Sequence, residues 1–355
     1  WRLVSEIDPT VQDVSDEFFA LRNGGSIPYY VNDNSLFGDV YCSTVGNNTN
    51  NGYLPGTPKA SVQALIDAID LEPGDVVYVD TGTYLLASEI VVGDLDAGGV
   101  TNPVIFRGST NFAVGGTVLD RQVGVGTAVR TYQTVGITFR DLTIRNAGVG
   151  LHFQESDACS AVGVRSLDNS ETAFLSSESP TCYLTRVTAA FCSNGVQIIS
   201  GHLTMDGVVN WGNEAPMVMG EFSSVHLRNS VLHAAGQASR IWRLSEVGGS
   251  IDGDYNDYVR EENALFYERT RALGGNEIYA RLTDWQFGTG RDLHSLSHDP
   301  LFVDESAGDF HPRSATGRFT DSGSLTNDSP GIFSPLIDTG DPASSYTSEP
   351  PPHGG

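Results

Sequence analysis

Basic residues are scarce in this chain. Lysine and arginine together number 20 against 44 aspartates and glutamates, Lys59 is the only lysine, and the formal net charge is −24. A field of this sign repels phosphate backbones and anionic lipid headgroups, because too few cations are present to neutralise them. The composition therefore argues against nucleic-acid binding and against electrostatic attachment to membranes. It suits solubility in salt, calcium binding, or a source adapted to salt.

Long apolar runs are missing as well. None approaches the ~20 residues that a membrane-spanning helix requires, so we expect no membrane insertion. The chain begins at Trp1 without a Met or a signal peptide, which predicts that it is a piece of a longer protein.

Six short apolar runs recur at a nearly constant interval between residues 142 and 267. The steps between their first residues are 24, 23, 21, 24 and 24. No 3.6-residue pattern links them, and each alternates like a short strand. A strand-containing repeat of this length without a helix is typical of a solenoid. We therefore predict an all-β parallel β-helix, with the first residues of the runs stacked in one column of one sheet: Val149, Ala173, Val196, Met217, Ile241 and Leu265.

Cysteine is rare, with four residues. Cys159 and Cys182 are 23 residues apart, one repeat, and stacked strands ~4.8 Å apart would bring their Cα atoms within reach of a disulfide. The spacing is equally consistent with two free thiols; a bridge would indicate an exported protein. Cys42 and Cys192 have no assigned partner. No C-x-x-C or Cys/His spacing indicates a zinc site.

The segment 29–84 carries the most specific motifs. Tyr-Tyr-Val-Asn-Asp at 29–33 is followed by a polar loop at 46–52. An amphipathic helix is predicted near 58–70, with Thr57 as N-cap and Pro58 as its first residue. Pro-Gly-Asp at 73–75 then leads into a Val-rich strand and Gly-Thr-Tyr at 82–84.

These motifs, in this order, resemble the opening of pectate-lyase-like right-handed parallel β-helix proteins. The resemblance covers about residues 29–345 and implies that the helix covers the N-terminal end of the solenoid, where it would shield strand edges. The segments 299–311 and 334–342 resemble the closing part of β-helix modules in large bacterial secreted and surface proteins. That likeness implies an extracellular or cell-surface location, with further domains in the same parent protein.

Three parts are expected along the chain. Residues 1–25 resemble the last strand of a bacterial immunoglobulin-like module, or else form a cap strand and linker. Residues 26–345 form the β-helix. Residues 346–355 form a Pro/Gly-rich tail.

The resemblance leaves the activity open, because the superfamily contains lyases, hydrolases and adhesins. A polygalacturonase-like hydrolase would need an adjacent Asp-Asp and a Gly-His-Gly; the chain has no Asp-Asp, and Gly201-His202 is followed by Leu203. A lyase needs a base beside a cation that stabilises the enolate. The family base is usually Lys or Arg, and only Arg is available within the coils.

An acidic stretch after the repeats is the candidate calcium site. Asp252, Asp254 and Asp257 could hold a loosely built Ca²⁺ between coils. The spacing is not that of an EF-hand, because residue 263, at position 12 of such a loop, is Asn. The alternative is that exposed strand arginines simply pair with these neighbouring acids.

The candidate glycan site is a strand that combines an aromatic ring with two cations. We predict that Arg240 and Trp242 point outward as a glycan platform, with Arg243 beside them and Tyr267 one coil further on. The alternative is an exposed Trp on a neutral face or at an interface with another module. The sequence thus favours a non-catalytic extracellular or surface module, structural or adhesive, that contacts polysaccharide. A calcium-assisted polysaccharide lyase is the alternative.

Overall fold

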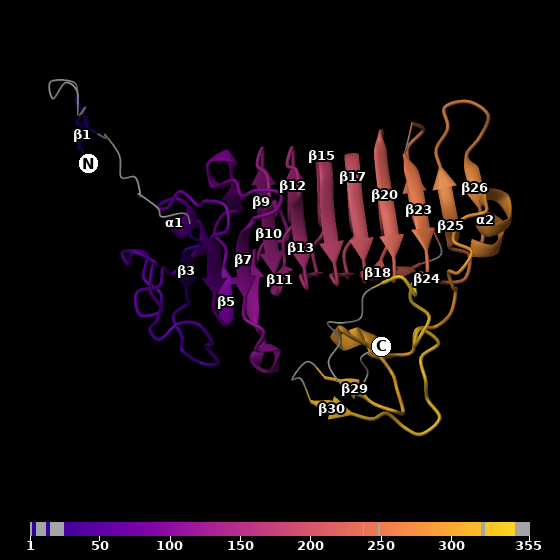
Figure 1. The fold of residues 1–355 in the computed structure, drawn as a ribbon. Helices are drawn as coiled ribbons and strands as arrows, with labels where there is room; N and C mark the ends of the chain where they lie inside the picture. The colour runs from indigo at the N-terminus through magenta and orange to yellow at the C-terminus, as the bar shows by residue number, and fades with distance from the viewer. Residues whose placement is uncertain are drawn as a thin grey trace.

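The computed structural model describes residues 2–4, 12–14, 25–236, 238–247, 249–320 and 324–344. Stacked strands run from β3 at one end to β26 at the other (Figure 1); they are parallel up to β25, and β26 pairs antiparallel with β25. The chain is a parallel β-helix, as the repeats predict. In the described part of the chain, no helix is long and apolar enough to cross a membrane.

Two sheets form the solenoid. The larger has 16 strands: β3 (Pro28–Val31), β4 (Val76–Val79), β6 (Ile90–Val92), β7 (Val104–Gly108), β9 (Thr127–Tyr132), β10 (Ile137–Arg140), β12 (Val149–Gln154), β13 (Cys159–Val162), β15 (Thr172–Thr185), β17 (Asn194–Asp206), β19 (Ala215–Met219), β20 (Ser223–Arg228), β22 (Arg240–Leu244), β23 (Ser250–Asp254), β25 (Leu265–Arg269) and β26 (Glu277–Tyr279). The smaller has eight: β5 (Gly82–Leu85), β8 (Thr117–Asp120), β11 (Leu142–Arg145), β14 (Arg165–Leu167), β16 (Thr188–Ala190), β18 (Val209–Asn213), β21 (Val231–Ala234) and β24 (Asp257–Arg260).

The larger sheet consists of two ladders joined by the long strands β15 and β17. One, the β12 ladder, runs β6-β9-β12-β15-β17-β19-β22-β25. The other, the β10 ladder, runs β3-β4-β7-β10-β13-β15-β17-β20-β23. Each central coil therefore contributes one strand, or one half of a long strand, to each ladder and one strand to the eight-stranded sheet.

The six repeats lie on consecutive strands of the β12 ladder, so the predicted single parallel sheet is confirmed. The predicted register is wrong at four of the six positions. The residues that stack one above another with buried side chains are Ile90, Val129, Leu151, Phe174, Val196, Met217, Trp242 and Tyr267. Only Val196 and Met217 belong to both the predicted and the observed column.

The physical reason is that, from β9 onward, two consecutive residues are buried near the start of each strand of the β12 ladder. The position before the column faces the eight-stranded sheet: a Cβ added at Gly195 would lie 2.1 Å from Asn210 Oδ1, and one at Gly150 would lie 2.1 Å from Ser166 Oγ. Ile241 occupies this position in β22 and is fully buried, as is Trp242 after it. Strict in-out alternation fails there, and a phase error of one residue moves side chains to the wrong face.

The helices are short. α1 (Val62–Ile66) has five residues rather than the predicted 58–70, and its N-cap is Ser61 rather than Thr57. Val62 and Leu65 are buried against the solenoid; covering the N-terminal end remains a prediction. α2 (Leu282–Thr289) packs against β25 and β26 through Leu282 and Trp285. Three 3₁₀ turns complete the helical elements that the structure describes: η1 (Asp94–Asp96), η2 (Phe112–Val114) and η3 (Glu305–Ala307).

After α2 the chain returns along the outside of the eight-stranded sheet (Figure 1). This segment forms the antiparallel pairs β27 (Phe302–Asp304) with β28 (Asp309–Pro312) and β29 (Arg318–Phe319) with β30 (Leu325–Thr326). At the N-terminus, β1 (Arg2–Val4) pairs antiparallel with β2 (Gln12–Val14). The rest of the predicted module end at 1–25, up to residue 24, and the predicted tail at 346–355 lie outside the described residues.

Cys159 and Cys182 lie opposite each other on β13 and β15, but both thiols are free, so the predicted disulfide is corrected. In-register parallel strands hold equivalent Cβ atoms about one strand spacing apart, ~4.8 Å, whereas a disulfide needs ~3.8 Å. Both side chains are completely buried in the solenoid core.

Candidate functional site

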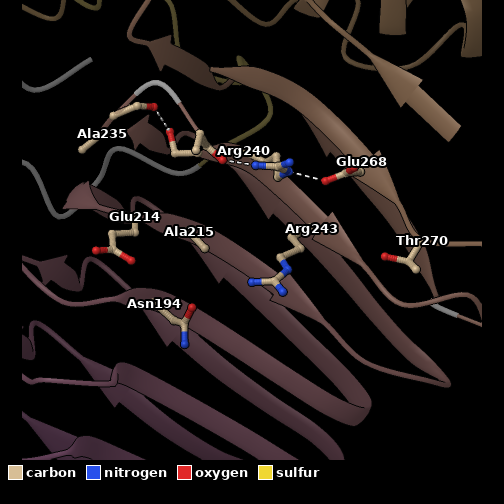
Figure 2. A pocket seen from close by; sticks show the side chains of 11 residues that line it. Asn194, Glu214, Ala215, Ala235, Arg240, Arg243, Glu268 and Thr270 are labelled. Carbon is tan, nitrogen blue, oxygen red and sulfur yellow. Dashed lines mark hydrogen bonds and ion pairs between the residues drawn. The ribbon is translucent and has the colours of Figure 1, made fainter. Parts of the chain in front are cut away.

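A cavity of about 640 Å³ opens on the outer face of the β12 ladder near its C-terminal end. Its polar wall comes from β17, β22 and β25 and from the turns beside them (Figure 2). The side chains that can contact a ligand there are Asn194, Glu214, Ser239, Arg240, Arg243, Glu268 and Thr270.

Arg240 and Glu268 form an ion pair on one side of the cavity. The Arg240 Nε donates to a Glu268 carboxylate oxygen, and Nη1 donates to the Ala238 carbonyl (Figure 2). The other Glu268 oxygen accepts from Asn276 Nδ2 at 2.8 Å. Burial alone would raise the pKa of Glu268, but the hydrogen bonds from Arg240 and Asn276 outweigh it and hold this pKa below its usual range. The pair is therefore locally neutral.

Arg243 is different, because its guanidinium is exposed and forms no hydrogen bond or ion pair within the described part of the chain. It lies opposite Val218 on β19 and Glu268 on β25. Glu214, at the turn before β19, is likewise exposed and without a hydrogen bond to any described residue. Figure 2 shows both side chains at the cavity with no interaction drawn to either. The cavity thus offers one free cation and one free carboxylate.

The predicted aromatic platform is wrong, although its two cations do line one cavity. Trp242 is 0% exposed and Tyr267 is 2% exposed, so neither ring can stack on a sugar. Both rings belong to the inward column, and the indole Nε1 has no hydrogen-bond partner among the described residues. For Trp242 the cause is the one-residue register error at Ile241 described above, and Tyr267 faces inward with it as its strand partner.

The three predicted calcium ligands are used separately. Asp252 accepts from His226 and Arg228, and Asp254 accepts from His294. Asp257 is 2% exposed and accepts the N–H of His298. Within the described ranges, no group of three His, Cys, Asp or Glu side chains could hold a metal ion, so the structure does not assemble the predicted site.

Sequence reasoning missed the other five side chains of the cavity: Asn194, Glu214, Ser239, Glu268 and Thr270. Glu268 could have been found from the repeat, because it lies 25 residues, about one coil period, after Arg243. The two residues are strand partners. Glu214 lies in the turn before one apolar run, and Asn194 lies at the start of a strand, just before another. Polar residues occur at these places in nearly every coil. Their type alone therefore carries no signal.

A second polar cluster lies four strands away on the same face. Arg130 pairs with Glu89 at 2.6 Å and donates to Gln154 at 3.1 Å. Its strand partner His152 contacts Ser177 Oγ through Nε2 at 2.7 Å. Burial, and then the neighbouring Arg130 charge, lower the pKa of His152 to about 4. The imidazole is therefore neutral at neutral pH, and the Arg130 charge is already balanced.

No protein-family model matches the chain, and no curated protein matches it. Among solved structures, one similar chain is the pectate lyase Pel9A, with a TM-score of 0.50, 14% identity, and coverage of 91% of this chain and 95% of that one. Another is a rhamnogalacturonan lyase, with a TM-score of 0.50, 11% identity, and coverage of 87% and 97%. At these identities the likeness concerns the fold. The chain therefore has the pectate-lyase-like parallel β-helix fold.

Proposed function

We propose that this chain is a non-catalytic carbohydrate-binding β-helix, exposed outside the cell, that binds acidic polysaccharide at the cavity around Arg243. The observation that carries the proposal is the free, exposed guanidinium of Arg243 in a chain whose net charge is −24. The charge of Arg243 acts on the Glu268 carboxylate opposite it, but that carboxylate is bonded to Arg240, so the N–H donors of Arg243 stay available to an external anion. A guanidinium presents paired N–H donors that match a carboxylate.

The neighbouring groups complete a surface for sugar hydroxyls. Asn194 and Thr270 provide amide and hydroxyl groups at the cavity wall, and Glu214 provides an acceptor. Carbohydrate-acting fold neighbours such as the two lyases are consistent with this class of ligand. Extracellular location and membership of a larger surface protein are part of the proposal; they are supported by the motifs at both ends of the solenoid.

The test is binding of soluble uronate polymers, namely polygalacturonate, alginate and hyaluronan, measured by affinity electrophoresis and calorimetry. Arg243→Ala should weaken binding about tenfold, since a hydrogen-bonded charge contributes ~1.5 kcal/mol or more. Arg243→Lys should restore part of it. Arg186→Ala is the matched control, because Arg186 is exposed on a distant turn and its loss changes the net charge equally. Equal binding by wild type and Arg243→Ala would rule out this site.

A polysaccharide lyase is the second candidate, favoured by one observation: two arginines line one cavity, and only one of them is neutralised. β-Elimination requires a base that removes the proton α to the carboxylate and a cation that balances the enolate. The same polymers are incubated with wild type, with and without calcium, and ultraviolet absorbance of the conjugated double bond is followed. A signal that Arg243→Ala abolishes would overturn the non-catalytic part of the proposal.

A further inference from the structure

We infer, on the basis of the function proposed above, that the ligand is a sparsely charged acidic polysaccharide. In such a polysaccharide, uncharged sugars separate the charged ones, whereas a homopolyuronate carries a carboxylate on every sugar. The inference concerns the spacing of charge along the polymer, and it follows from where charged side chains lie on the outer face of the β12 ladder.

The cavity can match only one negative group. Two arginines line it, but the Arg240 charge is balanced by Glu268. Arg243 is the remaining cation among the described lining residues. A second ligand carboxylate in the cavity would lie beside the Arg240–Glu268 ion pair, which has no net charge to attract it.

Glu214 would repel a neighbouring ligand charge. It precedes Val218, the strand partner of Arg243, by four residues. With ~3.3 Å per residue and ~4.8 Å between strands, the Cα atoms of Glu214 and Arg243 are about 14 Å apart. That distance spans more than one sugar ring, so a bound segment reaches both side chains. An uncharged sugar can donate hydroxyl groups to the Glu214 carboxylate, whereas a uronate beside it is destabilised.

Among the described residues, the outward row that leads from Arg243 toward the N-terminal end of the ladder offers no cation that could compensate further ligand charge. The outward residues that follow Arg243 across the ladder are Val218, Gln197 and Leu175, all uncharged. Next comes His152, which is four strand steps away, ~19 Å, and neutral at neutral pH. Arg130 lies one strand further and is held by Glu89. A polymer with a charge on every sugar would thus place several carboxylates on uncharged surface of a protein that carries −24 overall.

The experiment compares polygalacturonate with the same chain in which every second carboxylate, on average, is methyl-esterified. Sugar type and length stay constant while charge spacing changes. Calorimetry at physiological ionic strength should show tighter binding of the esterified polymer. Glu214→Gln should strengthen polygalacturonate binding about two- to fivefold, the range for one exposed charge pair, and leave the esterified polymer nearly unchanged.

Glu72→Gln is the matched control, because Glu72 is exposed near the N-terminal end of the solenoid and its loss changes the net charge equally. The inference is overturned if polygalacturonate binds as tightly as the esterified polymer and Glu214→Gln leaves the ratio of the two affinities unchanged. Failure of the proposed function has a different signature: Arg243→Ala then weakens neither polymer. If neither polymer binds, both are rejected.

Discussion

Asp257 is the residue at which burial and charge conflict most directly. It is 2% exposed, Oδ1 accepts the N–H of His298 at 2.9 Å, and Oδ2 is buried with no hydrogen-bond partner in the described chain. Burial is the main cause that raises the pKa of Asp257, to about 6, and the nearby Asp299 charge adds to it. The folded state therefore holds this proton in a pH range where the unfolded chain releases it.

The sign of the resulting pH dependence follows from proton binding. The unfolded pKa is ~3.9, so between pH ~4 and pH 6 the folded state binds the extra proton. The contribution of Asp257 to the free energy of unfolding is largest below pH ~4 and falls by about 2 kcal/mol as pH rises to ~6. Asp257→Asn does not titrate. Its free energy of unfolding, relative to wild type, should therefore rise across this window in urea denaturation at constant salt.

Asp254→Asn provides the control of opposite sign. Burial of Asp254 opposes the effect of the hydrogen bonds from His294, but these bonds prevail and lower the pKa of Asp254. Its contribution is present at neutral pH and lost as pH falls through the folded pKa. The raised pKa of Asp257 would be contradicted if the free energy of unfolding of wild type minus that of Asp257→Asn stayed constant between pH 4 and pH 6.

At the same scale, Trp242 shows what the sequence could and could not predict. The period of the repeats identifies β22 and its neighbours, because every coil must stack on the one before it. Whether the Trp242 side chain points inward depends on whether the strand begins with one buried residue or with two. The pattern of apolar residues in the sequence does not distinguish these cases. Arg240 and Arg243 could be placed at a site from their type; Glu214 could not, because its role comes from the turn that precedes β19.

A buried amide ladder is the element that fixes the corner between the β12 ladder and the eight-stranded sheet. Asn169, Cys192 and Asn213 lie one above another, each four residues before the first residue of an apolar run. The Ala147 N–H donates to Asn169 Oδ1, the Asn169 N–H to Cys192 Sγ, and the Cys192 N–H to Asn213 Oδ1. Each side chain thus satisfies a backbone group of the preceding coil, which a buried turn requires.

The ladder makes a quantitative prediction at Asn213. Its Nδ2 donates to the Ala189 carbonyl at 2.8 Å, and its side chain is fully buried. Asn213→Ala removes this bond and the one from Nδ2 to Asn210 Oδ1, leaves the buried Cys192 N–H without its partner, and should lower the free energy of unfolding by about 3 kcal/mol. Chemical denaturation followed by circular dichroism measures the loss. Ser193→Ala, which removes a more exposed hydrogen bond to Ser170, should cost under ~1 kcal/mol. Equal costs for the two variants would refute the ladder's role.

At the scale of the whole molecule, the described part of the chain has two apolar cores. One fills the solenoid from Tyr29 to Trp285. The other lies outside it, where the returning C-terminal segment covers Ala190, Trp211 and Val231 with Phe302. The sequence predicts the first core because its residues recur with the coil period. It does not predict the second, because Phe302 comes more than 70 residues after the solenoid residues that it covers and belongs to no repeat.

The separation of the two cores leads to a prediction about Phe302. Its ring is 3% exposed and packs edge-on against Trp211 and Phe310, with ring centroids 5.1 and 5.4 Å away. Phe302→Ala should cost about 3 kcal/mol within the outer core and raise amide hydrogen exchange in β27 and β28. Exchange in the solenoid strands β15 and β17 should stay slow, because their side chains pack in the inner core. Phe287→Ala, at a residue that is 95% exposed, should change neither region. Exchange that rises equally in β15 and β27 would show that the two cores unfold as one unit.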